Sequence, residues 1–579
     1  ALERLWGLIP GEECGATKQL GEVLRRSLLF LGRFDEAEEP LVKLHALEIE
    51  ESPEIWALSL DLYEKTERWR DAVSALERLS RLIEDPKKKA RNLFKEGELL
   101  RLHLSDEEGA ADRYLKAADL DPLHLPTARR LAEHFSRSGD WRQLVDVCQL
   151  LLENEPVESN AELARIQYAV GLILDGGADA VKAPGILRDA NLDYLEGGYA
   201  VKVLSDASIG LRSLDYTMAP MGRVLDALNS SFGDEVIKEW AETARGSLEQ
   251  KQGDLGLRRL MPRLEARVAR RKTALEHSKI LAFLDPQDPS IGDFKERSTS
   301  TSVPANALDV DGVLCPEGLK TPLRKALNRL APLLAGFKRQ FDDEIDGYES
   351  FEDTLSAKTK ARVEGLIKRL RVARVEIKVS DDPGLRVGVY DRATPVVTVS
   401  RGFLDRPAEE LIFVLSRSLE WVRSGSLLFL DREEKEREEL LLELACALGV
   451  AVERTNVSSD HMREWRDWLG RGFGALNERQ QSEIMAALKE SVGRREDLGS
   501  YLAAQNQMAQ RVGLMACGDL SVALWAAALE VRGAEVLEPS ALESREALLS
   551  GDPGMAELVR FGVSEKRKKI LRSSTITGY

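Results

Sequence analysis

The 579-residue sequence is poor in the residues that build disulfide frameworks and cysteine-rich zinc sites. It contains only five cysteines and six histidines, and no two cysteines form a Cys-x-x-Cys pair. An odd number of scattered cysteines argues against a disulfide framework and favours a reducing, cytoplasmic compartment. The cysteines are Cys14, Cys148, Cys315, Cys446 and Cys517.

Long apolar runs and an excess of positive charge are also missing. No stretch approaches the roughly 18 apolar residues of a membrane-spanning helix, so membrane insertion is not expected. The net charge is −16 and the isoelectric point about 5.2, which argues against nucleic acid as the main partner. With 43% hydrophobic and 31% charged residues, the composition is typical of a soluble globular protein.

A repeat of about 34 residues runs through the first part of the chain. Phe34 and Trp69 are 35 residues apart, and Ala110 and Leu144 are 34 apart. In each unit a polar turn precedes a helix with apolar residues at i, i+3, i+4 and i+7, and an acidic residue with Pro closes most units. Another predicted helix lies upstream of each of these helices, as in "IWALSLDLYEKT", "RNLFKEGELLRLH" and "PTARRLAEHFSRS".

This pattern resembles tetratricopeptide repeats, which are helix–turn–helix units of 34 residues. "YLKAADLDP" is the nearest single match, whereas the aromatic and glycine positions of the family's first helix are mostly absent. The resemblance predicts four repeats within residues 1–156. It implies a helical solenoid with a concave groove that binds peptides or proteins, and the alternative is a spacer or an assembly surface.

Residues 157–285 are predicted to continue the solenoid as less regular helices. The segment "LRRLMPRLEARVARRKTALEHSKIL" is predicted to be one long helix with a basic stripe that includes Arg258, Arg259 and Arg267. The stripe is interpreted as a solvated face, with an acidic partner surface as the alternative. Residues 286–307 are rich in Pro, Ser and Thr and are predicted to link this array to a second domain over 308–579.

The second domain begins with a possible phosphatase motif. Asp309 and Asp311, in "LDVDGV", resemble the first motif of haloacid-dehalogenase phosphatases. That chemistry needs the two carboxylates at the end of a buried strand, but the preceding "STSTSVPANA" is polar. The alternative interpretation is an acidic turn ahead of the helix "PLRKALNRLAPLLAGFKRQF".

The spacing of the apolar residues changes from a helical to a strand-like period between residues 367 and 404. "VARVEIKVS", "GLRVGVYD" and "TPVVTVSRGFL" alternate or are rich in β-branched residues, which predicts three strands. Helical patterns resume at "PAEELIFVLSRSLEWVRSG" and continue through "SYLAAQNQMAQRVGLMACG" and "LSVALWAAALEV". The second domain is therefore predicted to be α+β.

Over residues 366–535 the order of these elements, with "VSRGFLD", "EELIFVL" and "RSG", resembles a family of enzymes. It is similar to the catalytic core of the CAAX-protease and heat-shock membrane protease family of zinc metallopeptidases. In that family the helix carries His-Glu-x-x-His, in which two histidines bind zinc and the glutamate activates water. A third ligand, a glutamate, comes from a later helix.

The residues at these positions cannot bind zinc. The resemblance places Arg417, Ser418 and Trp421 at the His-Glu…His positions, and Asn506 and Gln510 at the Glu and Asp positions of the later motif. Arginine has no lone pair to offer a metal. The resemblance thus implies a degenerate site without metal or cofactor, plugged by Trp421, with Arg417 paired to Glu420 or to a carboxylate from the later helix that carries Asn506. The alternative is an unrelated α+β domain with an amphipathic helix at 407–423.

These observations predict a mostly α protein, in which a TPR-like helical solenoid precedes a smaller α+β domain. The predicted function is that of a non-enzymatic scaffold or adaptor that binds other proteins through the solenoid groove, within a larger assembly. The second domain would be a second docking surface. The alternative is a hydrolase, either a phosphatase that uses Asp309 and Asp311 or an unrecognised peptidase-like enzyme.

Overall fold

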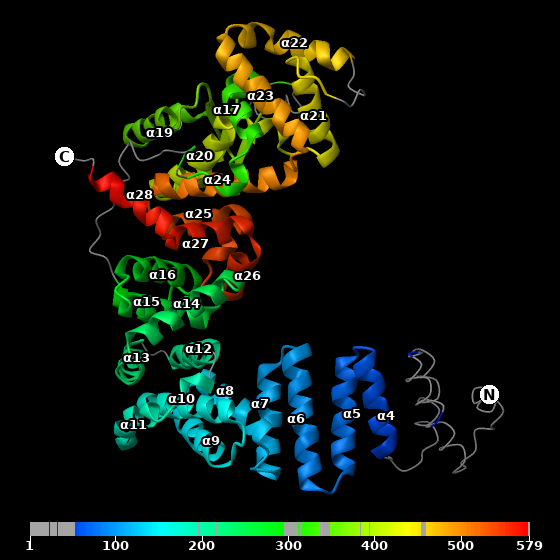
Figure 1. The fold of residues 1–579 in the computed structure, drawn as a ribbon, viewed down its shortest axis with the longest axis vertical. Helices are drawn as coiled ribbons and strands as arrows, with labels where there is room; N and C mark the ends of the chain where they lie inside the picture. Colours follow the sequence, from blue (N-terminus) through cyan, green and yellow to red (C-terminus); the bar gives the residue numbers. More distant parts are fainter. Residues whose placement is uncertain are drawn as a thin grey trace, which may run out of the picture. The chain divides into compact units, whose positions relative to one another are not determined.

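The structure is a computed structural model, and its chain divides into two compact units, residues 1–243 and 244–579 (Figure 1). We describe each unit by itself. The structure describes Val23, Gly32 and residues 53–576, except for 195–196, 215–217, 295–310, 313, 336, 338–347, 383, 393 and 453–458. The mostly α fold class with a small α+β part is confirmed.

The first unit contains the predicted helix pairs. The first helices of the pairs are α4 (Pro53–Lys65), α6 (Pro86–His103) and α8 (Leu125–Ser138), and the second helices are α5 (Trp69–Leu82), α7 (Glu107–Leu120) and α9 (Trp141–Asn154). Each helix packs against its neighbours in sequence, as expected for a repeat array (Figure 1). The predicted repeat near Leu31 lies outside the described residues.

Polar caps explain why these helices begin where they do. The carboxylates of Asp106 and Asp140 accept hydrogen bonds from the backbone N–H groups of Gly109 and Gln143, at 2.9 and 3.2 Å. Each bond satisfies one of the N–H groups that a helix start leaves without a partner. At the other end of α8, Gly139 adopts the left-handed conformation with a φ of 82°. The turn residues of the repeat therefore set its helix boundaries.

Beyond α9 the unit continues with less regular helices. They are α10 (Glu158–Asp175), α11 (Ala183–Arg188), α12 (Gly197–Ser213) and α13 (Ala219–Phe232), while α14 (Asp234–Gln250) crosses into the second unit. Helix α12 packs closely on α8, since a Cβ atom on Gly210 would lie 2.2 Å from the carbonyl oxygen of Ser136. Only glycine allows this approach of two backbones.

The boundary between the units differs from the predicted linker at 286–307. Helices α15 (Leu255–Arg267) and α16 (Arg271–Leu284) belong to the second unit, in which α16 packs on α25 (Leu520–Arg532) and α27 (Pro553–Val563). Part of the predicted linker is itself buried, because Asp288 forms an ion pair of 3.1 Å with Arg259. Residues 295–307 lie outside the described residues.

The predicted basic helix is also corrected. It is two helices, separated at Ala269, whose φ is 60°. Arg258 and Arg259 are not solvated but only 1% exposed each. Arg258 donates to the backbone and side-chain oxygens of Gln252 at 2.8 and 2.6 Å, and burial lowers its pKa to about 9. Only the later part of the stripe, including Arg267, Arg271 and Lys272, is exposed.

The described part of the second unit holds one small mixed sheet with the order β1-β2-β4-β3. The three predicted strands are confirmed as β2 (Glu376–Ser380), β3 (Val387–Tyr390) and β4 (Val396–Ser400), while β1 (Glu349–Ser350) was not predicted. β2 pairs with β4 in parallel, and β3 pairs with β4 antiparallel. All residues of the central strand β4 are buried, whereas β3 is half-buried at the edge.

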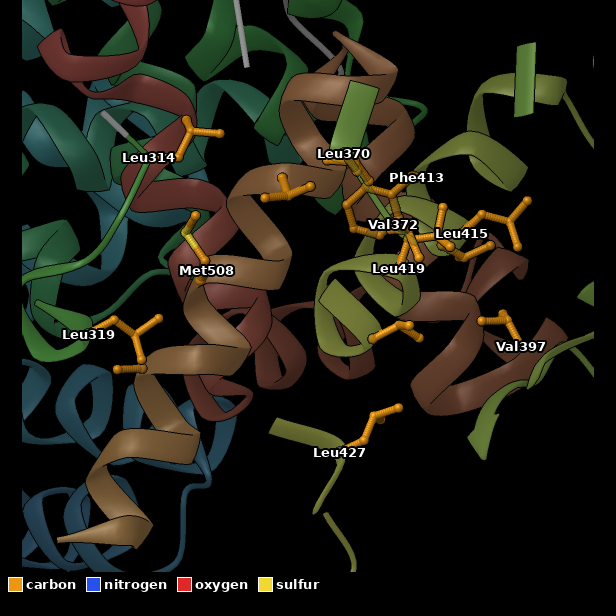
Figure 2. Packing of buried hydrophobic residues seen from close by; sticks show 14 of the residues in the cluster. Leu314, Leu319, Leu370, Val372, Val397, Phe413, Leu415, Leu419, Leu427 and Met508 are labelled. Carbon is orange, nitrogen blue, oxygen red and sulfur yellow. The ribbon is translucent and has the colours of Figure 1, made fainter. Parts of the chain in front are cut away.

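Helix α20 (Ala408–Arg423) crosses the centre of this unit and packs on α24 (Leu498–Cys517). Figure 2 shows Phe413, Leu415 and Leu419 of α20 within one buried cluster that also includes Val397 of β4 and Met508 of α24. The remaining helices are α17 (Pro322–Leu334), α18 (Phe351–Thr354), α19 (Ala357–Leu370), α21 (Glu434–Ala447), α22 (Ser459–Gly474), α23 (Glu478–Arg494), α26 (Leu542–Gly551) and α28 (Glu565–Ile576).

Candidate functional site

The helix at the predicted zinc-ligand positions is α20. Arg417 is about four-fifths buried and forms an ion pair with Glu530 of α25, at 2.6 Å, not with Glu420. Both expected partners are therefore wrong, because Glu530 lies on α25 and not on α24, the later helix that carries Asn506 and Gln510. The Ser418 hydroxyl donates to the carbonyl oxygen of Val414 at 3.1 Å, within the same helix. Both polar side chains thus have partners inside the protein.

Trp421 does not plug the site as predicted. It is only partly buried and lines a pocket of about 320 Å³, which we call the β3 pocket. Arg417, Ser418 and Trp421 form one wall of this pocket. The other walls come from β3 and from Asp391 directly after it, from Glu530, and from residues 427 and 430–432. Three of the five predicted positions therefore meet around an open pocket beside the edge strand.

The two positions on α24 do not belong to this pocket. Opposite Arg417, α24 presents Gly513, where an added Cβ would lie 2.9 Å from the Arg417 Cγ. Gln505, not Asn506, approaches Glu420, with 3.5 Å between Nε2 and Oε1. Gln510 is buried next to Gly554 of α27. In the described part of the chain, no group of three or more His, Cys, Asp or Glu side chains is arranged to hold a metal ion.

A buried ionic cluster lies one turn further along α20, and its partners come from segments far apart in the sequence. The Glu420 side chain is fully buried and accepts hydrogen bonds from Arg324 of α17, at 2.9 Å, and from Arg423, at 2.7 Å. Arg324 also donates to Gln505 Oε1 at 2.5 Å. We call Arg324, Glu420, Arg423 and Gln505 the Glu420 cluster.

Asp311, one of the two candidate phosphatase residues, is held by this cluster. Both of its carboxylate oxygens accept hydrogen bonds from Arg423 at 2.9 Å, and Arg324 approaches to 3.2 Å. Burial favours the neutral acid, but the hydrogen bonds and charges of Arg423 and Arg324 outweigh burial and lower the pKa of Asp311. Asp311 lies in a turn, and Asp309 lies outside the described residues.

In the first unit, a hollow of about 390 Å³ opens over α8, and we call it the α8 hollow. Its lining comes from three helices of the array and from the less regular α10 and α12, including Phe94 of α6, Arg130 and Glu133 of α8, and Tyr199 of α12. Leu151 of α9 and three residues of α10 complete it together with Lys202, Val203 and Asp206 of α12. The concavity therefore forms where helices of the repeat array meet the less regular helices that follow them.

The charges of the α8 hollow form a paired network. Arg130 donates to both oxygens of Glu98, at 2.9 and 3.0 Å, and to Glu133 at 3.0 Å. Lys202 donates to Glu133 at 2.6 Å. Burial raises the pKa of Asp206 to about 6, against the opposing charge of Lys202. The network fixes the side chains in place around the exposed aromatic ring of Tyr199, which is 50% accessible.

A solved structure has a remote likeness to this chain, whereas protein families and curated proteins show none. No protein-family model matches the chain, and no curated protein is recognisably similar to it. A solved structure, the C-terminal part of a TPR repeat-containing protein from Cytophaga hutchinsonii, is 14% identical over 48% of this chain and 99% of that chain. The TM-score is 0.27. The resemblance to zinc peptidases finds no support in these comparisons. No helix among the described residues is long and apolar enough to cross a membrane.

Proposed function

We propose that the chain is a non-enzymatic, cytoplasmic scaffold or adaptor that binds other proteins through the α8 hollow, within a larger assembly. The α8 hollow supports this proposal, because stacked helical repeats use such concave surfaces for binding. The half-exposed Tyr199 and the fixed charges of Arg130 and Lys202 offer both apolar and polar contacts. Tyrosine and arginine are the side chains most enriched at protein interfaces.

Partner binding through the α8 hollow is expected to depend on Tyr199. A photo-crosslinking amino acid at position 199 should capture a defined partner in cells, because this side chain is exposed within the hollow. Tyr199→Glu should weaken binding of that purified partner by about tenfold or more, the effect of losing an aromatic interface anchor. Fluorescence anisotropy would measure the affinity.

Leu115 of α7 provides the matched control for this experiment. It is 44% exposed and does not line the hollow. Leu115→Glu introduces the same charge and should leave the affinity unchanged. If crosslinks at 115 capture the same proteins as crosslinks at 199, or if both glutamate variants bind equally well, the array is a spacer and the proposal is wrong.

We also propose that the β3 pocket is a second docking surface, for an extended peptide that adds to the sheet as a further strand. Among the described residues, β3 pairs only with β4, and its register directs the N–H and C=O groups of Val387 and Val389 away from β4. Such an edge accepts a peptide strand, and adjacent pockets then select its side chains. On this proposal, a degenerate peptidase cleft serves for binding alone.

Proline at position 389 is expected to abolish peptide addition to β3. Val389→Pro removes an outward N–H group without removing a bond to β4. Peptides selected from a random library on the full chain, and dependent on Trp421, should bind this variant about tenfold more weakly. Isothermal titration would measure the change, with Tyr199→Glu as the control in the other unit. Equal binding to Val389→Pro would remove the case for strand addition.

A further inference from the structure

The second unit has a groove of about 1120 Å³ beside α17, which we call the α17 groove. Helices α17, α19, α20 and α23 contribute to its walls, together with residues 372–374, Pro395 and Asp311. The volume exceeds the roughly 300–1,000 Å³ of typical small-molecule sites. The groove thus has room for a segment of polypeptide.

The α17 groove is positively charged, although the protein as a whole carries a net charge of −16. Five cationic and three acidic side chains line it. All three carboxylates are engaged in ion pairs: Asp311 with Arg423 at 2.9 Å, Glu490 with Arg494 at 2.6 Å, and Glu483 with Arg329 and Arg479. The acidic side chains of the groove are therefore already neutralised by neighbouring arginines.

Three of the cations, in contrast, have no ion-pair partner within the described part of the chain. They are Lys325 of α17, Arg371 at the end of α19, and Arg374 ahead of β2. All three are exposed. Like charges gathered without counter-charges repel one another and attract an anionic ligand, and low-dielectric walls strengthen the attraction. This charge distribution specifies the sign of the ligand.

Much of the remaining lining of the α17 groove is apolar, and most of these apolar residues are small or rigid. Ala331, Pro332 and Leu333 come from α17, Pro395 precedes β4, and Ala486 and Ala487 come from α23. Short side chains let another backbone approach closely, and apolar contacts reward a ligand that has apolar side chains between its charges. A simple inorganic anion would leave this surface unused.

We propose that the α17 groove binds an acidic segment of a partner protein, in which carboxylates alternate with apolar residues. Lys325, Arg371 and Arg374 pair with the carboxylates, and the alanine and proline surface receives the apolar side chains. This site is separate from the α8 hollow and the β3 pocket. It does not depend on either being a binding site, and the Tyr199→Glu and Val389→Pro variants should leave it intact.

The test uses the full chain and a short fluorescein-labelled peptide of repeated Glu-Leu-Asp-Leu units. We expect saturable binding near physiological salt, weakening as salt rises because exposed ion pairs are screened. The triple variant Lys325→Gln, Arg371→Gln, Arg374→Gln should bind about tenfold more weakly, the combined effect of three exposed ion pairs. The neutral peptide of Gln-Leu-Asn-Leu units should bind the unmodified chain no better than it binds the triple variant.

A second triple variant controls for the change in net charge. Arg386, Lys435 and Arg463 are exposed cations of the same unit that do not line the groove. Changing all three to Gln should leave the affinity unchanged. Equal losses in both triple variants, or no binding of the acidic peptide, would overturn the proposal. Stronger binding of a single-stranded RNA oligonucleotide, lost only in the groove variant, would overturn it in favour of a nucleic-acid ligand.

Discussion

Trp465→Ala is expected to lower the free energy of unfolding of the second unit by about 3–5 kcal/mol, the usual range for a large aromatic residue in a core. Trp465 lies on α22 and is fully buried. Its ring stacks on Phe337 with 3.5 Å between centroids, and its indole N–H donates to Glu443 Oε2 at 3.1 Å. Truncation would create a cavity and also leave a buried carboxylate oxygen without this donor.

Trp421→Ala is the matched comparison, since it removes the same side chain from a different environment. Because Trp421 is only partly buried beside the open β3 pocket, water can fill the space that it leaves. We expect a loss below about 2 kcal/mol, from reduced burial alone. Urea unfolding followed by circular dichroism would measure both variants. A loss for Trp421→Ala as large as that for Trp465→Ala would mean that Trp421 is a core residue, as the sequence first indicated.

Local patterns made much of the fold predictable. The helices of the repeat follow from apolar spacing and from polar caps such as Asp106 and Asp140, which lie within a few residues of the groups that they bond. The strands β2 to β4 follow from runs of β-branched residues. These signals are contained in short windows of sequence, so tertiary structure is not needed to interpret them.

The boundary between the units could not be predicted in this way. A stretch rich in Pro, Ser and Thr is typical of a linker, but here the helices ahead of it, α15 and α16, belong to the second unit, where α16 packs on α25 and α27. The partners are more than two hundred residues apart in sequence. Likewise Arg259 has the spacing of a solvated residue, but in the fold it is buried in an ion pair with Asp288.

The candidate site was predicted in part. The resemblance to a peptidase drew attention to α20, and three of its marked positions do line one pocket. The helix also carries a stronger feature between those positions: Glu420, whose partner Arg324 is 96 residues away. A glutamate within an apolar helix can be interpreted as one half of a buried ion pair only when the other half is known, and the sequence does not identify it. The resemblance to the peptidase motif therefore pointed to Trp421 instead.

Glu420→Ala is expected to destabilise the second unit by about 3–5 kcal/mol, the cost of breaking a buried ion pair by removing one partner. Glu420 is fully buried, and Arg324 is only 4% exposed. Without the carboxylate, Arg324 would keep its hydrogen bond to Gln505 and its longer contact with Asp311. Its charge would then be poorly compensated in a low-dielectric environment. Urea unfolding of the full chain would measure the change.

Glu409→Ala on the same helix is the control for this prediction. Glu409 pairs with Arg362 at 3.0 Å, but its side chain is 45% exposed. An exposed pair of this kind contributes about 1 kcal/mol or less, because water screens the charges. The same substitution of the same residue type thus separates the effect of burial from the effect of removing a glutamate from α20.

A double-mutant cycle would then show whether the two charges act as a pair. Arg324→Ala alone should also be strongly destabilising, since Glu420 would keep only Arg423 and the more distant amide of Gln505. The double variant should be less destabilised than the sum of the two single variants, because neither charge is left buried without the other. Additive losses would contradict this account, and Arg423 with Gln505 would then be the groups that compensate Glu420. A loss for Glu420→Ala no larger than that for Glu409→Ala would show that the cluster admits water and contributes little to stability.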